Sequence, residues 1–422
     1  MPLKPSLQSE RDLTRRNFLC CGTLLFAGLW GLAAPSSGLT FKDGVSNPCE
    51  PDRPWANAEQ ALIDASFAGL NATDIIDVHA HLLGTGDSGS GCHVNASLYS
   101  LWRPIEVLRR KNILGAGCVD ETASDIDRQY LATLRRLMAD FPAGAKAALL
   151  AFDCAYDDRG QRDLAQSTFF VPNSYAAASM AANRERFEWV TSVHPYRDDA
   201  VEQIADARAK GAIALKWLPS AMNINWRDAR LNPVYDYLAR TRMPLIAHFG
   251  EEKAVPGARR DEFLNPLYAR VPLDRGVRLI MAHCASLGRA PDLDRASNMT
   301  VPCFDLFARL MANRDYEGLL LADTSAVFQD NRRAAVWQRI IAETAWHPRL
   351  VHGSDYPLPG VWPLYNLEAL TYAKVLDPAL LPVLQSIRRR NVLLFDFALK
   401  RQLRFGSTAL ANSVFMARKT LA

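Results

Sequence analysis

The chain contains a pair of histidines whose spacing suits metal binding. His79 and His81 close the apolar segment IIDVHAH and are followed at once by glycine-rich residues. Alternate residues of a β-strand point the same way, so both imidazoles, with Asp77 before them, are expected to share one face. Imidazoles are common ligands of zinc and similar divalent ions. The pair therefore predicts a metal site where this strand ends.

Other ligand-type residues close apolar segments in the same manner. They are Lys216 in AIALKW, His248 in MPLIAH, His283 in VRLIMAH and Asp355 in RLVHGSD. If these segments are neighbouring parallel strands of a closed barrel, their side chains meet the two histidines at one mouth. Several imidazoles with a carboxylate at one place predict a divalent cofactor, zinc, at one or two ions per chain.

Eight apolar segments alternate with helix-like segments along the chain. They are DIIDVHAH, AKAALLAFD, FEWVTSVHP, AIALKWLPS, MPLIAHFGEE, VRLIMAHCAS, EGLLLADTS and PRLVHGSDYP. Near-continuous apolar runs are typical of parallel strands that are covered on both faces. We predict an α/β fold of the (β/α)8 TIM-barrel type. The alternative, an open doubly wound sheet, would need a GxGxxG turn after its first strand, and GTGDSGSG lacks that spacing.

The length of 422 residues accommodates this barrel with additions at both ends. We place the barrel at residues 72–398, an N-terminal extension at about 40–70, and a C-terminal helix and tail at 399–422. Extra helices are expected at 103–112 and 128–141. The net charge of 49 − 45 = +4 is spread along the chain. The one tight basic cluster outside the N-terminus, 388–390, predicts a solvated helix face rather than a nucleic-acid site.

The first 38 residues have the layout of an export signal. Arg15 and Arg16 precede an apolar run and then small residues, and the segment TRRNFL resembles the twin-arginine (Tat) signature. We predict export through the Tat machinery and a periplasmic protein. A membrane anchor is the alternative, although the run is at the short limit for a span. Lipidation at Cys20 or Cys21 is less favoured because no convincing lipobox precedes them.

Six cysteines remain after the signal. Cys92 and Cys118 lie in loop-like surroundings where a disulfide could form in an exported protein. Cys284 follows an apolar strand and reads as a small buried hydrophobe. No CxxC spacing occurs, which argues against a zinc site built from thiolates.

The order of these motifs resembles a known family. DVHAH on the first strand, the histidine ends of PLIAHFGEE and LIMAHCASLG, and HGSDYP on the last strand are similar to the amidohydrolase superfamily, in its amidohydrolase-related (family 2) branch. The terminal RRNVLLFDF is also similar to that branch. The likeness covers residues from about 72 to 398. It implies a metal-dependent TIM-barrel enzyme with His79, His81, Lys216, His248, His283 and Asp355 as metal ligands.

Lys216 separates two forms of this resemblance. A protonated lysine has no lone pair for a metal, but a neutral amine can take up carbon dioxide and form a carbamate. Binuclear members such as phosphotriesterase carry such a carboxylated lysine on the fourth strand, whereas the decarboxylases of the branch are mononuclear. Alternatively, Lys216 extends out of the strand end or pairs with Asp153.

The remaining candidates have weaker support. His194 could contact substrate or be structural, and the rings of Trp217, Trp226 and Tyr356 could wall a pocket. Asp153 could orient a ligand histidine from behind. Glu251 and Glu252 read as solvated loop acids. His352 is three residues before Asp355 and is expected to pack on the opposite face, while nothing argues for His93 or His347.

The resemblance implies hydrolysis of an amide, lactone or ester in a small-molecule substrate. Metal-activated water would attack, and Asp355 would be the catalytic residue that moves the proton. The alternatives are a mononuclear decarboxylase of the aminocarboxymuconate-semialdehyde decarboxylase type and a non-catalytic exported barrel. A phosphate-cradling kinase-like protein has no glycine–lysine loop to support it. A homo-oligomer is compatible with the sequence.

Overall fold

The structure is a computed structural model that describes residues 46–295 and 299–421. At its centre lies an eight-stranded parallel sheet, ordered as the strands follow along the chain. Its members are β1 (Ile76–His81), β3 (Lys146–Leu150), β7 (Phe187–Thr191), β8 (Ala212–Trp217), β9 (Leu245–His248), β10 (Leu279–Ala282), β13 (Leu320–Asp323) and β14 (Leu350–Val351). Each coincides with one of the eight apolar segments of the sequence.

The last strand returns to the first and closes the sheet. The Val78 amide donates to the His352 carbonyl at 3.0 Å, and the His81 amide donates to the Tyr356 carbonyl, also at 3.0 Å. Ala80 and Tyr356 form a parallel bridge at the same place. The predicted (β/α)8 TIM barrel is therefore confirmed.

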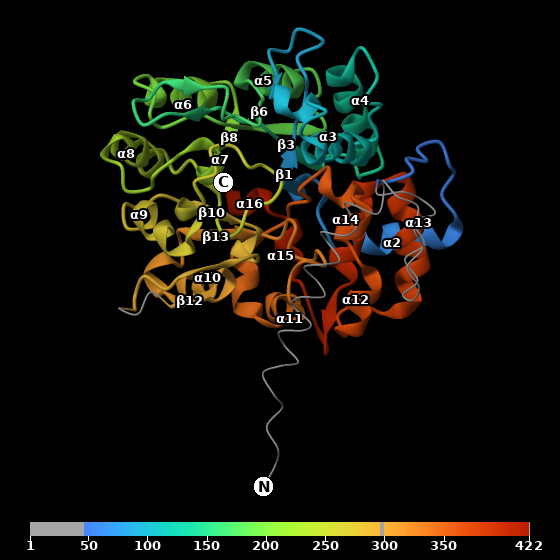
Figure 1. Ribbon diagram of the computed structural model, residues 1–422. Coiled ribbons are helices and arrows are strands. Elements are labelled where there is room, and N and C mark those ends of the chain that lie inside the picture. The colour runs from blue at the N-terminus through green and yellow to red at the C-terminus, as the bar shows by residue number, and fades with distance from the viewer. Residues whose placement is uncertain (1–45, 296–298, 422) are drawn as a thin grey trace.

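Helices surround this sheet (Figure 1). The longer ones are α2 (Asn57–Phe67), α3 (Pro104–Ala116), α4 (Ile126–Ala139), α5 (Asn173–Ala181), α6 (Ala200–Ala209), α8 (Asn232–Thr241), α10 (Cys303–Ala312), α11 (Ala334–Ala342), α13 (Leu381–Arg390) and α14 (Val392–Gln402). Shorter ones are α7 (Pro219–Met222), α9 (Arg270–Leu273), α12 (Leu367–Tyr372), α15 (Asn412–Phe415) and α16 (Arg418–Leu421). The two extra helices expected between the first and second strands are α3 and α4.

Short two-stranded ladders decorate the loops. They are β2 (His93–Val94) with β6 (Phe169–Phe170), β4 (Ala155–Tyr156) with β5 (Arg162–Asp163), β11 (Arg289–Pro291) with β12 (Thr300–Pro302), and β15 (Arg404–Phe405) with β16 (Thr408–Ala409). The first of these connects the segment after β1 to the segment after β3. It therefore ties together two loops on the side of the barrel where the strands end.

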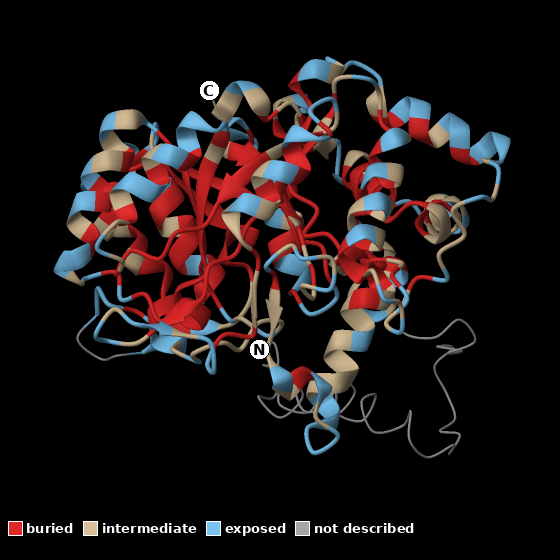
Figure 2. Cartoon of the chain, turned by 90° about the horizontal axis from the view of Figure 1, so that it is seen from above, coloured by how far each residue is buried: buried red, intermediate tan, exposed pale blue. Residues whose placement is uncertain are grey.

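The core has two parts. Aliphatic side chains inside the barrel form one cluster, namely Ile76, Val78, Ala148, Leu150, Val190, Ala214, Ile246, Ile280, Leu321 and Val351. A larger cluster fills the space between strands and helices, and the exposed faces of those helices point outward (Figure 2). Ala417 and Leu421 of the C-terminal tail pack on the inner cluster. The tail therefore covers one end of the barrel and leaves the other for a site.

The N-terminal segment with the predicted signal, residues 1–38, lies outside the described residues, so Tat export stays a prediction. Within residues 46–295 and 299–421, no helix combines the length and apolar character that crossing a membrane requires.

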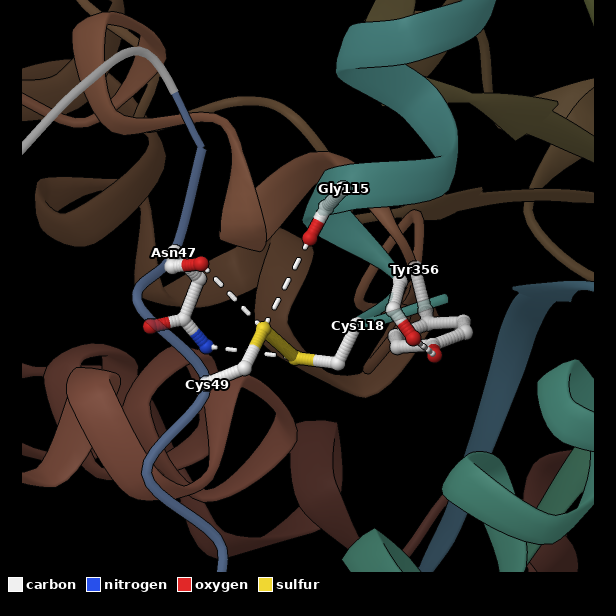
Figure 3. Close-up of a disulfide and its surroundings, with 6 residues drawn as sticks. Asn47, Cys49, Gly115, Cys118 and Tyr356 are labelled. Atoms are coloured by element: carbon white, nitrogen blue, oxygen red, sulfur yellow. Dashed lines mark hydrogen bonds between the residues drawn. A yellow bond between two sulfur atoms is a disulfide. The ribbon is translucent and has the colours of Figure 1, made fainter. Parts of the chain in front are cut away.

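A disulfide joins the N-terminal extension to the barrel. Cys49 is bonded to Cys118, directly after α3, whereas Cys92 has a free buried thiol. The disulfide considered possible for Cys92 and Cys118 therefore involves only Cys118, because the extension brings Cys49 to it. Figure 3 shows Tyr356 beside this disulfide, and its hydroxyl donates to the carbonyl of Gly117 at 3.2 Å. The crosslink thus secures a segment that contacts the end of the last strand.

Arg388 in α13 is buried, contrary to the solvated face expected for the basic cluster. Its guanidinium donates to four backbone carbonyls, those of Pro359, Val361, Trp362 and Tyr365. Burial lowers its pKa to about 9. The carbonyls of Val361 and Trp362 also accept from the amides of Leu364 and Tyr365. Within the described residues, those of Pro359 and Tyr365 accept from Arg388 alone, so this side chain helps to hold the loop that follows β14 in one conformation.

Removing the disulfide should destabilise the protein. Changing Cys49 and Cys118 together to Ser frees a loop that spans 69 residues of sequence. We expect the free energy of unfolding to fall by about 2–4 kcal/mol, measured by denaturant titration. Adding a reductant should lower the free energy of unfolding of the wild type to that of the variant, and it should not change the free energy of unfolding of the variant. Equal stability of the oxidised wild type and the variant would contradict the crosslink.

Arg388→Met should cost about 3 kcal/mol of stability, because it leaves buried carbonyls without donors. Arg389→Met is the matched control from the same cluster. Arg389 forms an ion pair with Glu50 at 3.3 Å on the surface, and its loss should change stability by less than about 1 kcal/mol. Thermal or denaturant unfolding measures both. Similar effects of the two substitutions would contradict the structural role of Arg388.

Candidate metal centre

A bulge in β1 turns both predicted histidines into the barrel mouth. The pairing register of β1 with β3 shifts between Asp77 and Ala80. Neighbouring residues of a regular strand point to opposite sides, but an extra residue changes the direction of the side chains that follow it. His79 and its neighbour Val78 therefore both point into the barrel. The sequence suggested that Asp77 shares a face with the two histidines, but in the structure it does not. Its carboxylate accepts from the backbone amides of His79 at 3.0 Å and Ser354 at 2.9 Å.

The mouth of the barrel contains a cavity of about 390 Å³. All six predicted ligands line it, namely His79, His81, Lys216, His248, His283 and Asp355. They come from five strands that are far apart in sequence, and the closed sheet brings their ends together. Apolar side chains such as Leu83, Phe152 and Leu218 complete the lining.

Three of these residues form a compact donor group. Nε2 of His81 lies 3.2 Å from Oδ1 of Asp355, and Nε2 of His79 lies 3.6 Å from the same oxygen. Their donor atoms all lie within 4.8 Å of one another. Two imidazole nitrogens and a carboxylate oxygen at that spacing can bind one divalent ion.

Asp323, at the end of β13, holds His79 from behind. Its Oδ2 lies 2.9 Å from Nδ1 of His79, and its Oδ1 accepts from the backbone amide of His283 at 3.0 Å. Burial alone would raise the pKa of Asp323, but His79 and the other partners hold it below its usual value. The ionised carboxylate therefore fixes the proton of His79 on Nδ1 and leaves Nε2 available.

His248 and His283 are supported in a similar way. Nδ1 of His248 lies 3.3 Å from Oε2 of Glu252, and Nε2 of His248 is buried without a hydrogen-bond partner among the described residues. Nδ1 of His283 lies 2.8 Å from the hydroxyl of Ser325. Each ring therefore has one nitrogen engaged by the protein and the other left for a ligand. Glu252 is not a solvated loop acid as expected, whereas Glu251 is exposed.

Lys216 lies in the middle of this group. Its side chain is buried, and Nζ is 3.2 Å from Nε2 of His79. It therefore does not extend to solvent, and within the described residues it forms no hydrogen bond or ion pair with Asp153. Burial lowers its pKa, although Asp323 and Asp355 oppose the shift. This environment favours a neutral amine more than an exposed lysine would.

Two of the donors sit on backbone that is unfavourable for ordinary residues. His283 has φ of +56° and Asp355 has φ of +60°. Non-glycine residues rarely adopt this region, and such strain is concentrated at functional sites. Two residues before Asp355, Gly353 passes so close to His79 that an added Cβ would lie 2.8 Å from the histidine Cβ. A glycine is required there for the last strand to approach the first.

The protonation states of the group fit a divalent metal. Burial lowers the pKa of His81, His248 and His283, which keeps these imidazoles neutral. Burial alone would raise the pKa of Asp355, yet the neighbouring histidines, His283 first, hold it well below its usual value. Neutral imidazoles, an ionised carboxylate and the orphaned nitrogen of His248 are the donor set that a divalent cation satisfies.

Five other predicted residues are not among those that line the cavity. One is Trp226, whose Nε1 donates to the Phe263 carbonyl at 2.8 Å. Both ring nitrogens of His194 are engaged by backbone groups, and Nε1 of Trp217 donates to the Val193 carbonyl at 2.9 Å. Tyr356 points to Gly117 instead. Asp153 accepts from the backbone amides of Cys154 and His194 rather than from a ligand histidine. No contact supports their predicted site roles. His352 packs on Phe397 and Phe415, as its position suggested.

Sequence reasoning missed Asp323, Glu252, Gln329 and Arg332. Asp323 did carry a signal, because it closes the seventh apolar segment as the ligands close theirs. Gln329 and Arg332 lie in the loop after β13 and line the cavity. Loop residues show no periodicity, so nothing in their spacing indicates this position.

Asp323→Asn should weaken metal retention by about 10–100-fold, since the amide cannot replace the carboxylate behind His79. Competition with a chelator, followed by elemental analysis, measures the effect. Asp153→Asn is the matched control, because Asp153 is equally buried but contacts no ligand. Equal metal retention in both variants would contradict the role of Asp323.

Comparisons with known proteins agree with this geometry. A family model described as Amidohydrolase matches residues 76–381, well over half of the chain. A comparison with curated proteins finds no significant match.

Among solved structures, the chain is similar to an uncharacterized TIM-barrel protein from Bordetella bronchiseptica (18% identity, 76% of this chain and 99% of that chain covered, TM-score 0.45). It is also similar to a probable 2-pyrone-4,6-dicarboxylic acid hydrolase from Acinetobacter baumannii (13%, 71% and 91%, 0.39). A third is 5-carboxyvanillate decarboxylase from Sphingomonas paucimobilis (12%, 75% and 96%, 0.41). On the family match, this chain belongs to the amidohydrolase family, in its amidohydrolase-related TIM-barrel branch.

Proposed function

We propose that this chain is a metal-dependent hydrolase that cleaves an amide, lactone or ester. The observation that carries the proposal is Lys216, a buried amine within the ring of donors and 3.2 Å from Nε2 of His79. A lysine at this place supplies a bridging carboxylate once its neutral amine is converted to a carbamate. That conversion would complete a two-ion centre, which favours a hydrolase over a mononuclear decarboxylase.

His79, His81 and Asp355 would hold one divalent ion, zinc in this proposal. Carboxylated Lys216, His248 and His283 would hold a second. When bound, such ions polarise a carbonyl and lower the pKa of water. The supporting side chains behind the imidazoles, Asp323, Glu252 and Ser325, keep the rings oriented for this task.

Asp355 is the proposed proton carrier. Its carboxylate is buried at the mouth, and its pKa lies well below the usual value, so it is ionised and able to accept a proton. It would take a proton from the attacking water and deliver it to the leaving group. His81, 3.2 Å away, keeps that carboxylate in place.

A non-catalytic barrel is less consistent with these contacts. Buried imidazoles and carboxylates are costly to keep without partners, and the orphaned Nε2 of His248 has no structural role among the described residues. Buried donors of this kind are expected to be kept in a protein that uses them to bind a ligand.

Lys216→Ala tests hydrolase against lyase. The substitution removes the proposed bridging carboxylate and leaves space, so the rate should fall by orders of magnitude and part of the metal should be lost. Formate, acetate or propionate should restore part of the activity, because each supplies two oxygens of the same kind. Bicarbonate should not. Esters, lactones and amides are screened on the wild type first, and metal content is measured alongside.

Lys253→Ala is the matched control. Lys253 also lines the cavity but is exposed and paired with Glu251 at 3.4 Å. Small acids should not change the activity of that variant. Full metal content and unaffected turnover in Lys216→Ala would contradict the two-ion hydrolase and favour the decarboxylase.

A further inference from the structure

Arg332 is a buried cation that lacks an anionic partner. It lies in the loop after β13, is 9% exposed and lines the same cavity as the metal-ligand candidates. Its Nε donates to the hydroxyl of Ser286 at 3.2 Å, and its Nη1 donates to Oε1 of Gln329 at 2.6 Å and to Asn331. All three partners are neutral. Within the described residues, no carboxylate lies within ion-pair distance of this guanidinium.

Apart from Lys216, which belongs to the proposed metal-ligand group, the other cationic side chains at the cavity are compensated. Arg109 pairs with Glu106, Arg110 pairs with Glu121 at 3.0 Å, and Lys253 pairs with Glu251. Burial lowers the pKa of Arg332 to about 10, although Asp355 and two glutamates act against the shift from a distance. A buried charge without a counter-charge is unfavourable, so an anion would stabilise Arg332.

A second donor lies beside it. Gln329 is 2% exposed, and its Oε1 already accepts from Arg332, which fixes the orientation of the amide. Its Nε2 is buried and has no hydrogen-bond partner in the described part of the chain. Nη2 of Arg332 likewise has no recorded partner among the described residues. Two unengaged N–H groups on one short loop form the kind of donor pair that suits the two oxygens of a carboxylate.

We propose that Arg332 and Gln329 bind a carboxylate group of the substrate. The inference deepens the proposed function, on which it rests, by naming the class of molecule that the site takes. The cavity of about 390 Å³ and its apolar lining, including Phe152, Phe169 and Leu218, fit a small carboxylic acid with an apolar body. The carboxylate is held by the loop after β13, and the bond to be cleaved faces the donors at the mouth.

Calorimetric titration with benzoate and with the neutral benzamide tests this without any turnover. The native, metal-loaded protein should bind benzoate more tightly than benzamide. Arg332→Gln should weaken the binding of benzoate about tenfold or more and leave the binding of benzamide unchanged. Arg110→Gln removes a cation of the same cavity that already has an ion-pair partner. It should change the affinity for neither benzoate nor benzamide. Elemental analysis should find the metal content of both variants unaltered.

A second variant keeps the test decisive if Arg332→Gln folds poorly. Gln329→Glu places a carboxylate next to Arg332, so it should raise Tm and suppress benzoate binding. Unchanged benzoate affinity in Arg332→Gln or Gln329→Glu would overturn the proposal. The proposal would also be overturned if the native protein did not bind benzoate, or if Arg110→Gln lost as much benzoate affinity as Arg332→Gln. Because binding is read without catalysis, this result and the Lys216 test can fail separately.

Discussion

The meeting of the first and last strands is the constraint on which the site depends. The amide of Asp355 donates to the carbonyl of His79 at 2.8 Å, and Asp77 accepts from both strands. Gly353 permits the close approach that this contact needs. Without this seam, the two histidines and Asp355 would not share a donor group. Ligand geometry and barrel closure are therefore set by the same hydrogen bonds.

The seam is supported from beneath by a buried ion pair. Nζ of Lys400 in α14 donates to the carbonyl of Gly353 and to Oδ2 of Asp396, both at 2.6 Å. Burial raises the pKa of Asp396 to about 7, with Lys400 acting against it. Lys400 is fully buried. The C-terminal helix thus contributes to the position of the last strand and, through it, to Asp355.

Much of this arrangement could be predicted from the sequence because strand ends have a simple signature. A polar residue that closes an apolar run marks the mouth of a parallel barrel, and His79, Lys216 and His248 are all found there. Asp323 carried the same signature and was overlooked. What could not be predicted depends on contacts between distant segments. The partner of Cys118 is in the extension, and the burial of Arg388 depends on the loop it holds. The position of Arg332 depends on the path of a loop that has no period.

Elemental analysis of the purified protein tests the central claim, that the barrel mouth is a divalent metal centre, most directly. The account predicts stoichiometric divalent metal, about one or two ions per chain, with zinc dominant. Substitution of both His79 and His81 by Ala should remove at least one ion per chain while the far-ultraviolet circular dichroism stays unchanged. A protein without stoichiometric metal, even after growth with added zinc, would contradict the account.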